Sequence, residues 1–228
     1  MKSNILISIF RQIPVVLVIT LALTGAAASV SEATPVDFPV PPDAGVFNVR
    51  LPPYNAKGDG ITDDTAAIQS AVDAAIADEL NNNDSGNPII YLPAGTYLVS
   101  SPIVCNNGKV WTGRMSFYGQ NRDTTVLRLK SNTPEFQNAA KPEAVLMTAS
   151  VYGAETVESN PTGSGNNAYR NFIRNLAVNT GSGNPGAIGI DWLATNDAVL
   201  SDVNIVSGDG QGQVGLAMDR PYTGPMYA

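Results

Sequence analysis

The chain has 228 residues, of which 43% are hydrophobic and 14% are charged, and its formal net charge at pH 7 is −7. Because its 13 basic residues are outnumbered by 20 acidic ones and form no basic stripe, nucleic acid is not expected as a partner. The absence of histidine excludes imidazole bases, histidine metal ligands and Ser-His catalytic pairs. The single cysteine, Cys105, excludes an intrachain disulfide, so we expect a buried thiol there and carboxylates for any proton transfer.

The first residues have the pattern of a secretory signal peptide. Lys2 is followed by an apolar stretch over residues 13–23 and by small residues at 25–28. The apolar stretch is shorter than the roughly 20 residues that a membrane-spanning helix needs. We predict a signal peptide over residues 1–28, with Ala33 as an alternative end, and a secreted protein without a membrane segment after cleavage. An uncleaved, membrane-anchored N-terminus is the alternative.

Composition sets the remaining boundaries. Residues 29–45 are rich in proline without helical or strand periodicity, so we expect an extended leader. The folded domain is predicted over residues 46–228, with an insertion at about 131–167, where Asn, Ser, Gly, Pro and Glu are frequent. Without its first 28 residues the chain keeps 11 basic and 20 acidic residues, a net charge of −9. A neutral substrate suits this charge better than a polyanion, unless calcium is bound.

One amphipathic helix is predicted soon after the leader. Apolar residues recur there in pairs, four positions apart, at Ala67, Ile68, Ala71, Val72, Ala75 and Ile76. This pattern predicts a helix of about 15 residues. It ends near Leu80, before the turn-forming run NNNDSGNP.

The stretch YNAKGDGITDDTAAIQSAVDAA, residues 54–75, contains four aspartates and raises the question of an acidic functional loop. Asp63 and Asp64 stand where a helix N-cap and first turn belong. Carboxylates there accept unpaired backbone N–H groups and favour the positive end of the helix dipole. We therefore predict that both are structural caps. A catalytic or metal-binding role for Asp59, Asp63 and Asp64 is the alternative.

Beyond residue 88 the pattern changes to short apolar or alternating runs, most of them separated by Gly, Asn, Asp or Pro. We predict strands at 89–92, 96–100, 115–118, 125–129, 172–178, 187–192, 199–206 and 214–218. No second helical stripe interrupts them, which excludes a βαβ sheet.

These runs repeat. IRNLAVNTG (173–181) aligns with LSDVNIVSG (200–208) at an offset of 27, and AIGIDW (187–192) aligns with QVGLAM (213–218) at an offset of 26. Such a period is typical of one winding of a parallel β-helix, which buries its apolar row only when windings stack. A β-sandwich with chance spacing is the alternative, and Asn107-Gly108 is its one strong hairpin signal.

The helix motif at 54–75, followed by IIYLPAGTYLVSSPI, closely resembles the N-terminal entry of the pectate-lyase-like superfamily of right-handed β-helix proteins. The resemblance covers roughly residues 46–130. It implies that the helix closes the N-terminal end of the windings. The second half, with Gly189-Ile190-Asp191-Trp192, looks like the first β-helix of glycoside hydrolase family 55, whose members are exo-acting β-1,3-glucanases. Because that family's catalytic acid lies in a second β-helix, no catalytic residue is carried over to this chain.

Alternation along the strands selects the candidate site residues. Asp191, Trp192 and Asp202 are the candidate substrate-binding residues. The parity of Trp192 with Ile190 also fits a core position, and Asp202 also fits a side-chain ladder with Asn175. Outward acids one winding apart suit retaining chemistry, and acids two windings apart suit inverting chemistry. The predicted register places no acid directly over another, so the catalytic residues stay unassigned and no metal ligand is named.

The combined prediction is an all-β fold, a right-handed single-stranded parallel β-helix with an N-terminal capping α-helix. We expect the chain to be the truncated N-terminal portion of a longer protein, or to need a partner over its last winding. The expected function is that of a secreted carbohydrate-active protein, part of a glycoside hydrolase acting on a β-1,3-glucan-like polysaccharide. The alternatives are a pectate-type polysaccharide lyase and a non-catalytic, glycan-binding, spike-type β-helix. No cofactor is expected, and calcium enters only under the lyase alternative.

Overall fold

The computed structural model describes residues 33–36, 44–81, 86–150, 156–221, 224 and 226–227. The predicted signal peptide, residues 1–28, and most of the predicted leader lie outside the described residues. All described residues belong to one compact unit, Glu32–Ala228, and everything below concerns that unit.

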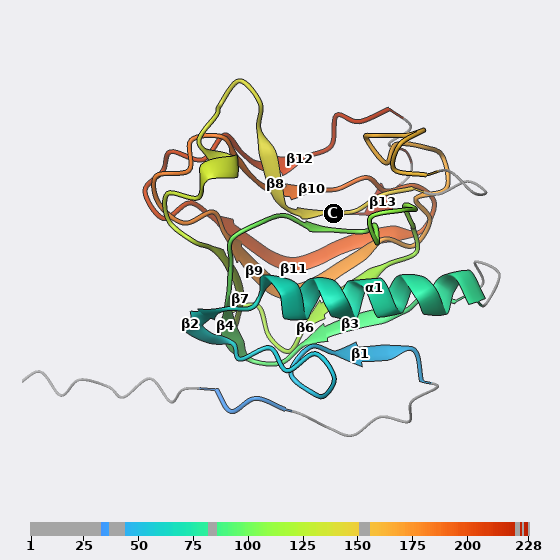
Figure 1. Ribbon diagram of the computed structural model, residues 1–228, viewed down its shortest axis with the longest axis horizontal. Helices are drawn as coiled ribbons and strands as arrows, with labels where there is room; N and C mark the ends of the chain where they lie inside the picture. Colours follow the sequence, from blue (N-terminus) through green and yellow to red (C-terminus); the bar gives the residue numbers. More distant parts are fainter. Residues whose placement is uncertain are drawn as a thin grey trace, which may run out of the picture. The chain divides into compact units, whose positions relative to one another are not determined.

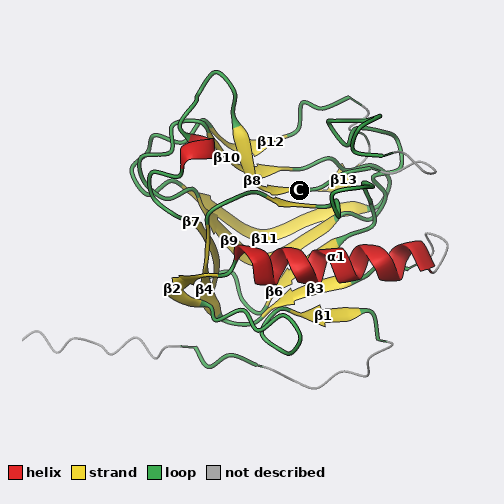
Figure 2. Cartoon of the chain, viewed as in Figure 1, coloured by secondary structure: helices red, strands yellow, loops and turns green. Residues whose placement is uncertain are grey.

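The strands stack in three parallel ladders, and the chain visits the ladders in turn (Figures 1 and 2). The first ladder contains β1 (Val46–Asn48), β3 (Ile89–Leu92), β6 (Ser116–Gly119), the first halves of β9 (Phe172–Asn179) and β11 (Ala198–Val206), and β13 (Met226–Tyr227). The second contains β2 (Asp59–Asp63), β4 (Gly95–Val99), β7 (Thr125–Leu129) and the second halves of β9 and β11. The third contains β5 (Ile103–Val104), β8 (Glu143–Met147), β10 (Ala187–Asp191) and β12 (Val214–Ala217).

The register between windings is the predicted one. Leu176 pairs with Val203 and Val178 with Ile205, while Ile190 pairs with Leu216. Among the named strands of the described chain every pairing is parallel, so the β-sandwich alternative is wrong. The Asn107-Gly108 signal marks only a local turn, in which the Asn107 N–H donates to the carbonyl of Val110. The arrangement fits a parallel β-helix.

A single residue lets β9 and β11 each serve two ladders. Asn175 (φ 57°) and Asp202 (φ 51°) occupy equivalent positions in the two strands and have left-handed backbone conformations. Asn and Asp adopt this conformation more readily than other non-glycine residues, since their short polar side chains bond locally. The strand turns a corner there without a loop. One winding earlier Gly119 lies against this bend, where a Cβ would collide with the backbone oxygen of Asn175.

The core is built from rows of apolar side chains that repeat from winding to winding. In the first ladder the row Ile90, Phe117 and Ile173 is in register and at most 2% exposed. In the third ladder Leu146 and Ile190 form an equally buried row. Each such side chain contributes roughly 1.5–3 kcal/mol on burial, which makes stacking of the windings the main source of stability.

The predicted insertion at 131–167 contains a strand of the stack. Residues Glu143–Met147 form β8, which pairs with β10 on one side and β5 on the other. Three consecutive residues of this strand, Ala144, Val145 and Leu146, are buried and hold it in the stack. The short 3-10 helix η1 (Pro134–Phe136) also returns to the core through Phe136, which is fully buried.

Helix α1 (Thr65–Asn81) lies along β1, β3 and β5 (Figure 1). Its buried face repeats the predicted stripe and joins the strand core through Ile68, Ala71, Val72, Ala75 and Ile76. Within the described residues, no helix combines the length and apolar character required to traverse a membrane.

Candidate functional site

The aspartates before α1 are held by hydrogen bonds to nearby backbone. Asp59 accepts the N–H groups of Ile61 (2.9 Å) and Thr62 (2.7 Å) and the Thr62 hydroxyl (2.8 Å). The backbone bonds, led by that from Thr62, lower the pKa of the Asp59 carboxyl below its usual value. In the described part of the chain, no group of three or more Asp, Glu, His or Cys residues could hold a metal ion.

Asp63 and Asp64 divide the predicted capping role. The Asp63 carboxylate accepts the N–H of Thr65 at 3.1 Å, next to the first turn of α1. The buried Asp64 carboxylate instead turns toward the preceding loop and accepts the N–H groups of Lys57 (2.6 Å) and Gly58 (2.9 Å). Only the Asp64 backbone carbonyl bonds the helix, at the N–H of Ile68. The prediction that the Asp64 side chain caps the helix is therefore wrong. The turn at Gly58 presents backbone N–H groups that bind its carboxylate instead. Its burial raises the pKa of the Asp64 carboxyl, which these two bonds oppose.

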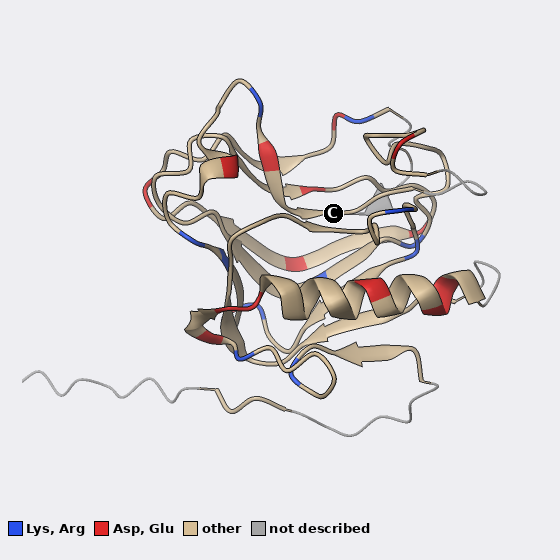
Figure 3. Ribbon diagram, in the orientation of Figure 1, with Lys and Arg blue, Asp and Glu red and all other residues tan. Residues whose placement is uncertain are grey.

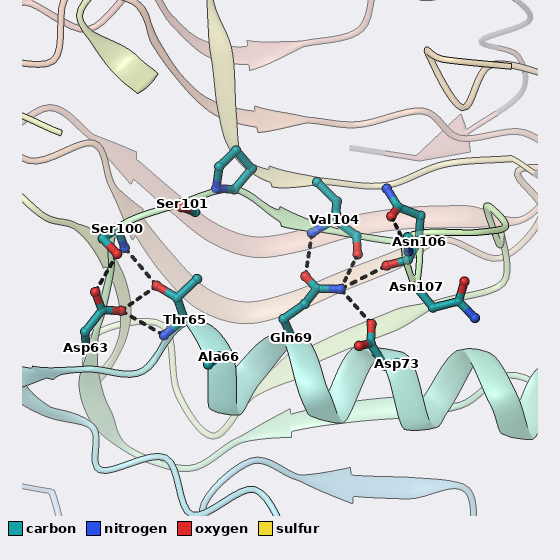
Figure 4. Close-up of a pocket in the computed structure, with 12 residues that line it drawn as sticks. Asp63, Thr65, Ala66, Gln69, Asp73, Ser100, Ser101, Val104, Asn106 and Asn107 are labelled. Carbon is teal, nitrogen blue, oxygen red and sulfur yellow. Dashed lines mark hydrogen bonds between the residues drawn. The ribbon is translucent and has the colours of Figure 1, made fainter. Parts of the chain in front are cut away.

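A hollow of about 610 Å³ lies between the first half of α1 and the segment 100–108 (Figure 4). Its lining residues with hydroxyl, amide or carboxylate groups are Asp63, Thr65, Gln69, Asp73, Ser100, Ser101, Asn106 and Asn107, while carbon atoms, including those of Ala66, Pro102 and Val104, form the larger part of its surface. Hollows of this size are typical of small-ligand sites. A neutral ligand rich in hydroxyl groups matches this lining.

Gln69 fixes the floor of the hollow. Its Nε2 donates to the carbonyls of Val104 and Asn106 and to the Asp73 carboxylate, each at 3.0 Å (Figure 4). Its Oε1 accepts the Val104 N–H at 3.1 Å. The Gln69 side chain thus joins α1 to β5. At the opposite end of the hollow, the Ser100 hydroxyl donates to the Asp63 carboxylate at 2.5 Å.

Several lining groups remain available to a ligand. The Ser101 hydroxyl and the side-chain Nδ2 atoms of Asn106 and Asn107 form no hydrogen bond within the described chain. These donors line the wall opposite α1, so the hollow offers a ligand hydrogen bonds that its own structure does not consume.

The candidate residue Asp191 is engaged in an ion pair. Arg220 Nε donates to Asp191 Oδ1 at 2.9 Å, and its other nitrogens donate to the carbonyls of Thr148 (2.5 Å) and Thr162 (3.0 Å). The side chains are 15% exposed for Asp191 and 10% for Arg220. Burial raises the pKa of the Asp191 carboxyl, and Arg220 opposes that change. The carboxylate therefore joins the chain after β12 to β10, with little surface left for a ligand.

The other two candidate residues have opposite environments, since Trp192 is buried and Asp202 is exposed. Trp192 is fully buried and its Nε1 donates to the Asn171 carbonyl at 3.1 Å, which confirms the core interpretation and leaves no ring face for a sugar. Asp202 is exposed at the bend of β11, 3.7 Å from Arg122. No hydrogen bond joins Asp202 to Asn175 among the described residues. Among the strand pairings of the described residues no outward acid lies directly over another, as predicted; Asp191 pairs with Ala217 on one side and with Met147 on the other.

Sequence reasoning did not select the outer row of the first ladder. Tyr91, Tyr118 and Arg174 occupy one register position in β3, β6 and β9. The alternation was visible in the sequence, but its significance depends on which windings are neighbours. A second hollow, of about 300 Å³, lies beside this row.

Residues 46–227 match the family model for rhamnogalacturonase A/epimerase, pectate lyase-like proteins. The chain belongs to this family. The match confirms the predicted relationship to pectate-lyase-like proteins and extends over every strand of the three ladders.

Three relatives illustrate the range of proteins that this chain is similar to. The chain is 28% identical over 181 residues to a probable glucan endo-1,3-beta-glucosidase of Arthroderma benhamiae, covering 76% of this chain and 19% of the relative. It is 27% identical to a glucan 1,3-beta-glucosidase of Cochliobolus carbonum, covering 72% and 19%. It is 35% identical to the mannuronan C5-epimerase AlgE5 of Azotobacter vinelandii, covering 48% and 10%. The pectate-lyase-like chain thus spans a fifth or less of the length of these relatives.

Proposed function

We propose that this protein is a secreted, carbohydrate-active member of the pectate-lyase-like family that acts on a β-1,3-glucan-like polysaccharide. The family match over residues 46–227 carries the proposal. Two relatives named for glucan 1,3-beta linkages align with about three quarters of the chain, at 76% and 72%. The right-handed winding, with α1 closing its first turn, is part of the same proposal.

The hollow beside α1 is the proposed contact for the glucan. Its available donors from Ser101, Asn106 and Asn107 suit sugar hydroxyls, and a neutral chain is not repelled by the net charge of −7. In the described ladders the register places no two carboxylates at one position of neighbouring windings, so no acid pair stands out for glycoside hydrolysis. We therefore assign these residues a role in holding the polysaccharide, and assign bond cleavage to none of them.

Retention of the full chain by immobilised polysaccharides tests the proposal. We expect retention on laminarin, a β-1,3-glucan, and a weaker effect with neutral polysaccharides of other linkage. Ser101→Trp fills the hollow and is expected to weaken laminarin binding roughly tenfold, the loss of about 1.4 kcal/mol. Ser70→Trp, on an exposed position of α1 outside the hollow, is the matched control. Equal laminarin binding by the two variants would show that the hollow is not the glucan contact. If no polysaccharide retained the chain, the proposed function itself would be rejected.

A uronate polysaccharide is the second candidate substrate. The relative at 35% identity is named for mannuronan, and the matched family includes epimerases in its description. Under this alternative, which includes pectate-type lyases, calcium is the implied cofactor. Two assays separate the glucan proposal from the uronate alternative. The first measures release of reducing ends from laminarin. The second measures unsaturated or epimerised products from polygalacturonate or alginate, with and without a chelator. Binding without any product would favour the non-catalytic, glycan-binding interpretation.

A further inference from the structure

The described part of the leader, residues 33–36, lies against the strand domain (Figure 1). Its side chains alternate in exposure. Ala33 and Pro35 are half-buried, whereas Thr34 and Val36 are exposed. A period of two is typical of an extended chain that turns every second side chain toward a surface. The leader segment is therefore packed on the domain in the manner of a strand.

The side chain of Gln120 bonds this segment through both atoms of its amide. Its Oε1 accepts the N–H of Val36 at 2.8 Å, and its Nε2 donates to the carbonyl of Thr34 at 3.1 Å. In an extended chain a carbonyl and the N–H two residues further on point to the same side. The Gln120 amide thus bonds the leader as a neighbouring parallel strand would.

The domain itself fixes the orientation of the Gln120 amide. The backbone N–H of Gln120, directly after β6, donates to the carbonyl of Leu92 at 2.9 Å. Its Oε1 also accepts the N–H of the buried Ala94 at 2.9 Å. Because the amide oxygen only accepts and the nitrogen only donates, this bond leaves Nε2 directed at the leader carbonyl. A side chain held in this way loses less conformational freedom when it binds a segment.

The position of Pro35 suits this arrangement. It stands between the two bonded residues, where the backbone groups of an extended chain point away from Gln120, so the missing N–H of proline costs no bond to the amide. Proline also restricts the residue before it, Thr34, to extended conformations. The segment consequently has less conformational entropy to lose when it docks.

No charged side chain of the segment takes part in the contact. Residues 33–36 are Ala, Thr, Pro and Val, and this piece of the ribbon is tan in Figure 3. The printed bonds join main-chain groups to one neutral amide, so they are expected to be insensitive to salt. Gln120 also lines the hollow of about 300 Å³ beside Tyr91 and Tyr118. The leader is therefore attached at the rim of that hollow.

We propose that Gln120 and the rim of this hollow form a docking site for an extended peptide segment with a central proline, and that residues 33–36 of the chain itself occupy it. The leader is then a bound strap and not a free tail. Both predicted ends of the signal peptide, Ala28 and Ala33, precede Thr34, so cleavage at either position keeps both bonded groups on the mature chain. The site does not depend on which polysaccharide the protein binds.

A spin label on the leader measures docking in the full chain. The label is attached to Thr34→Cys, at an exposed position. The native thiol, Cys105, is fully buried and its burial raises its pKa to about 12, so the reagent reacts with the introduced cysteine. We expect the label to broaden the NMR signals of Gln120, Gly119 and Ala94 at low and at high salt. Absence of this broadening would overturn the docking site.

Two leader variants separate the backbone contact from side-chain packing. Val36→Pro removes the N–H that Gln120 accepts and keeps an extended chain, whereas Val36→Ala keeps the N–H. The ratio of docked to free leader should fall roughly tenfold in Val36→Pro, the scale of a lost hydrogen bond, and by less than about twofold in Val36→Ala. Equal losses would overturn strand-like recognition of the main chain.

Gln120→Glu tests the contact from the domain side. The carboxylate still accepts the N–H of Ala94 but offers no donor to the carbonyl of Thr34. We expect docking to weaken roughly tenfold, as in Val36→Pro. Gln211→Glu adds the same charge at an exposed position and is the matched control. Equal docking in these two glutamate variants would overturn the role of Gln120, and thermal unfolding of each shows whether the fold is retained.

A free peptide with the sequence of residues 29–43 tests the site without the tether. It is added at millimolar concentration to the Val36→Pro chain, whose own leader is released. We expect the unmodified peptide to shift the side-chain amide signal of Gln120, and the same peptide carrying Val36→Pro to leave it unchanged. Equal effects of the two peptides, or no shift with either, would overturn the docking site.

Discussion

At the scale of single residues, the Asp191–Arg220 pair brings two charges together where little of either side chain is exposed. The pair is 2.9 Å apart and nearly covered. Removing one partner of a covered pair leaves the other charge without compensation, which costs about 3–5 kcal/mol. We predict that Asp191→Ala lowers the free energy of unfolding by about 3 kcal/mol in urea denaturation.

The exposed pair Lys141–Glu143, at 3.5 Å, supplies the comparison. Glu143→Ala should cost less than about 1 kcal/mol, as is usual for solvent-exposed pairs. Similar losses in Asp191→Ala and Glu143→Ala would show that the Asp191 carboxylate is better solvated than its surroundings indicate.

Two exposed aspartates make stability depend on pH. Backbone N–H groups lower the pKa of Asp59, through Thr62 and Ile61, and that of Asp209, through Gly183 and Gln211. A carboxyl with a lower pKa in the fold than in the unfolded chain stabilises the fold above its unfolded pKa, about 3.9, and loses that effect as pH falls through the folded value. We expect the contribution of these two carboxyls to the free energy of unfolding to decrease from about pH 5 downward, in urea titrations at fixed salt. The double variant Asp59→Asn, Asp209→Asn should show a shallower decrease, and an unchanged slope would contradict this origin.

Parity along a strand was enough to predict single residues that face the core, but not the partners of polar ones. Trp192 shares its parity with Ile190, and both are fully buried. Asp64 stands at a capping position in the sequence, yet its carboxylate bonds Lys57 and Gly58 because the loop folds back over it. Likewise the partner of Asp191 is Arg220, 29 residues away, which no local pattern indicates.

At the scale of elements, α1 is joined to the strands by one polar side chain as well as by its apolar face. Gln69 makes hydrogen bonds to backbone groups of Val104 and Asn106. We predict that Gln69→Ala destabilises the chain by about 2 kcal/mol, because it leaves partly buried backbone groups of β5 without partners. Hydrogen exchange should speed up at the Val104 amide in particular. Ser70→Ala, at an exposed position on the same helix, should change stability by less than about 0.5 kcal/mol, and an equal loss there would contradict the role of Gln69.

Periodicity predicted the type of element where the apolar run was long. It did not predict short strands that form only because they pair with a neighbouring winding. The apolar stripe predicted α1, and the strands near 89–92 and 125–129 lie where alternation placed them. β5 is only two residues long and exists because it pairs with β8. The corners at Asn175 and Asp202 depend on a backbone conformation that a sequence pattern does not reveal.

At the scale of the whole molecule, stability follows the position of a side chain within the stack. Leu146 and Leu216 occupy the same register position in the third ladder, on either side of Ile190. Leu146 is 1% exposed, whereas Leu216 in β12 is only partly buried. The two leucines therefore form a matched pair that differs in depth and not in chemistry.

We predict that Leu146→Ala lowers the free energy of unfolding by about 2–5 kcal/mol, through lost burial and the cavity left between windings. Leu216→Ala should cost less than half as much, because water already reaches part of that side chain and the site collapses more easily. Urea unfolding of both variants, followed by fluorescence of the two buried tryptophans, Trp111 and Trp192, measures the difference. Equal costs would mean that the last described winding is as well covered as the middle ones, and the stacking gradient inferred from the three ladders would then have to be abandoned.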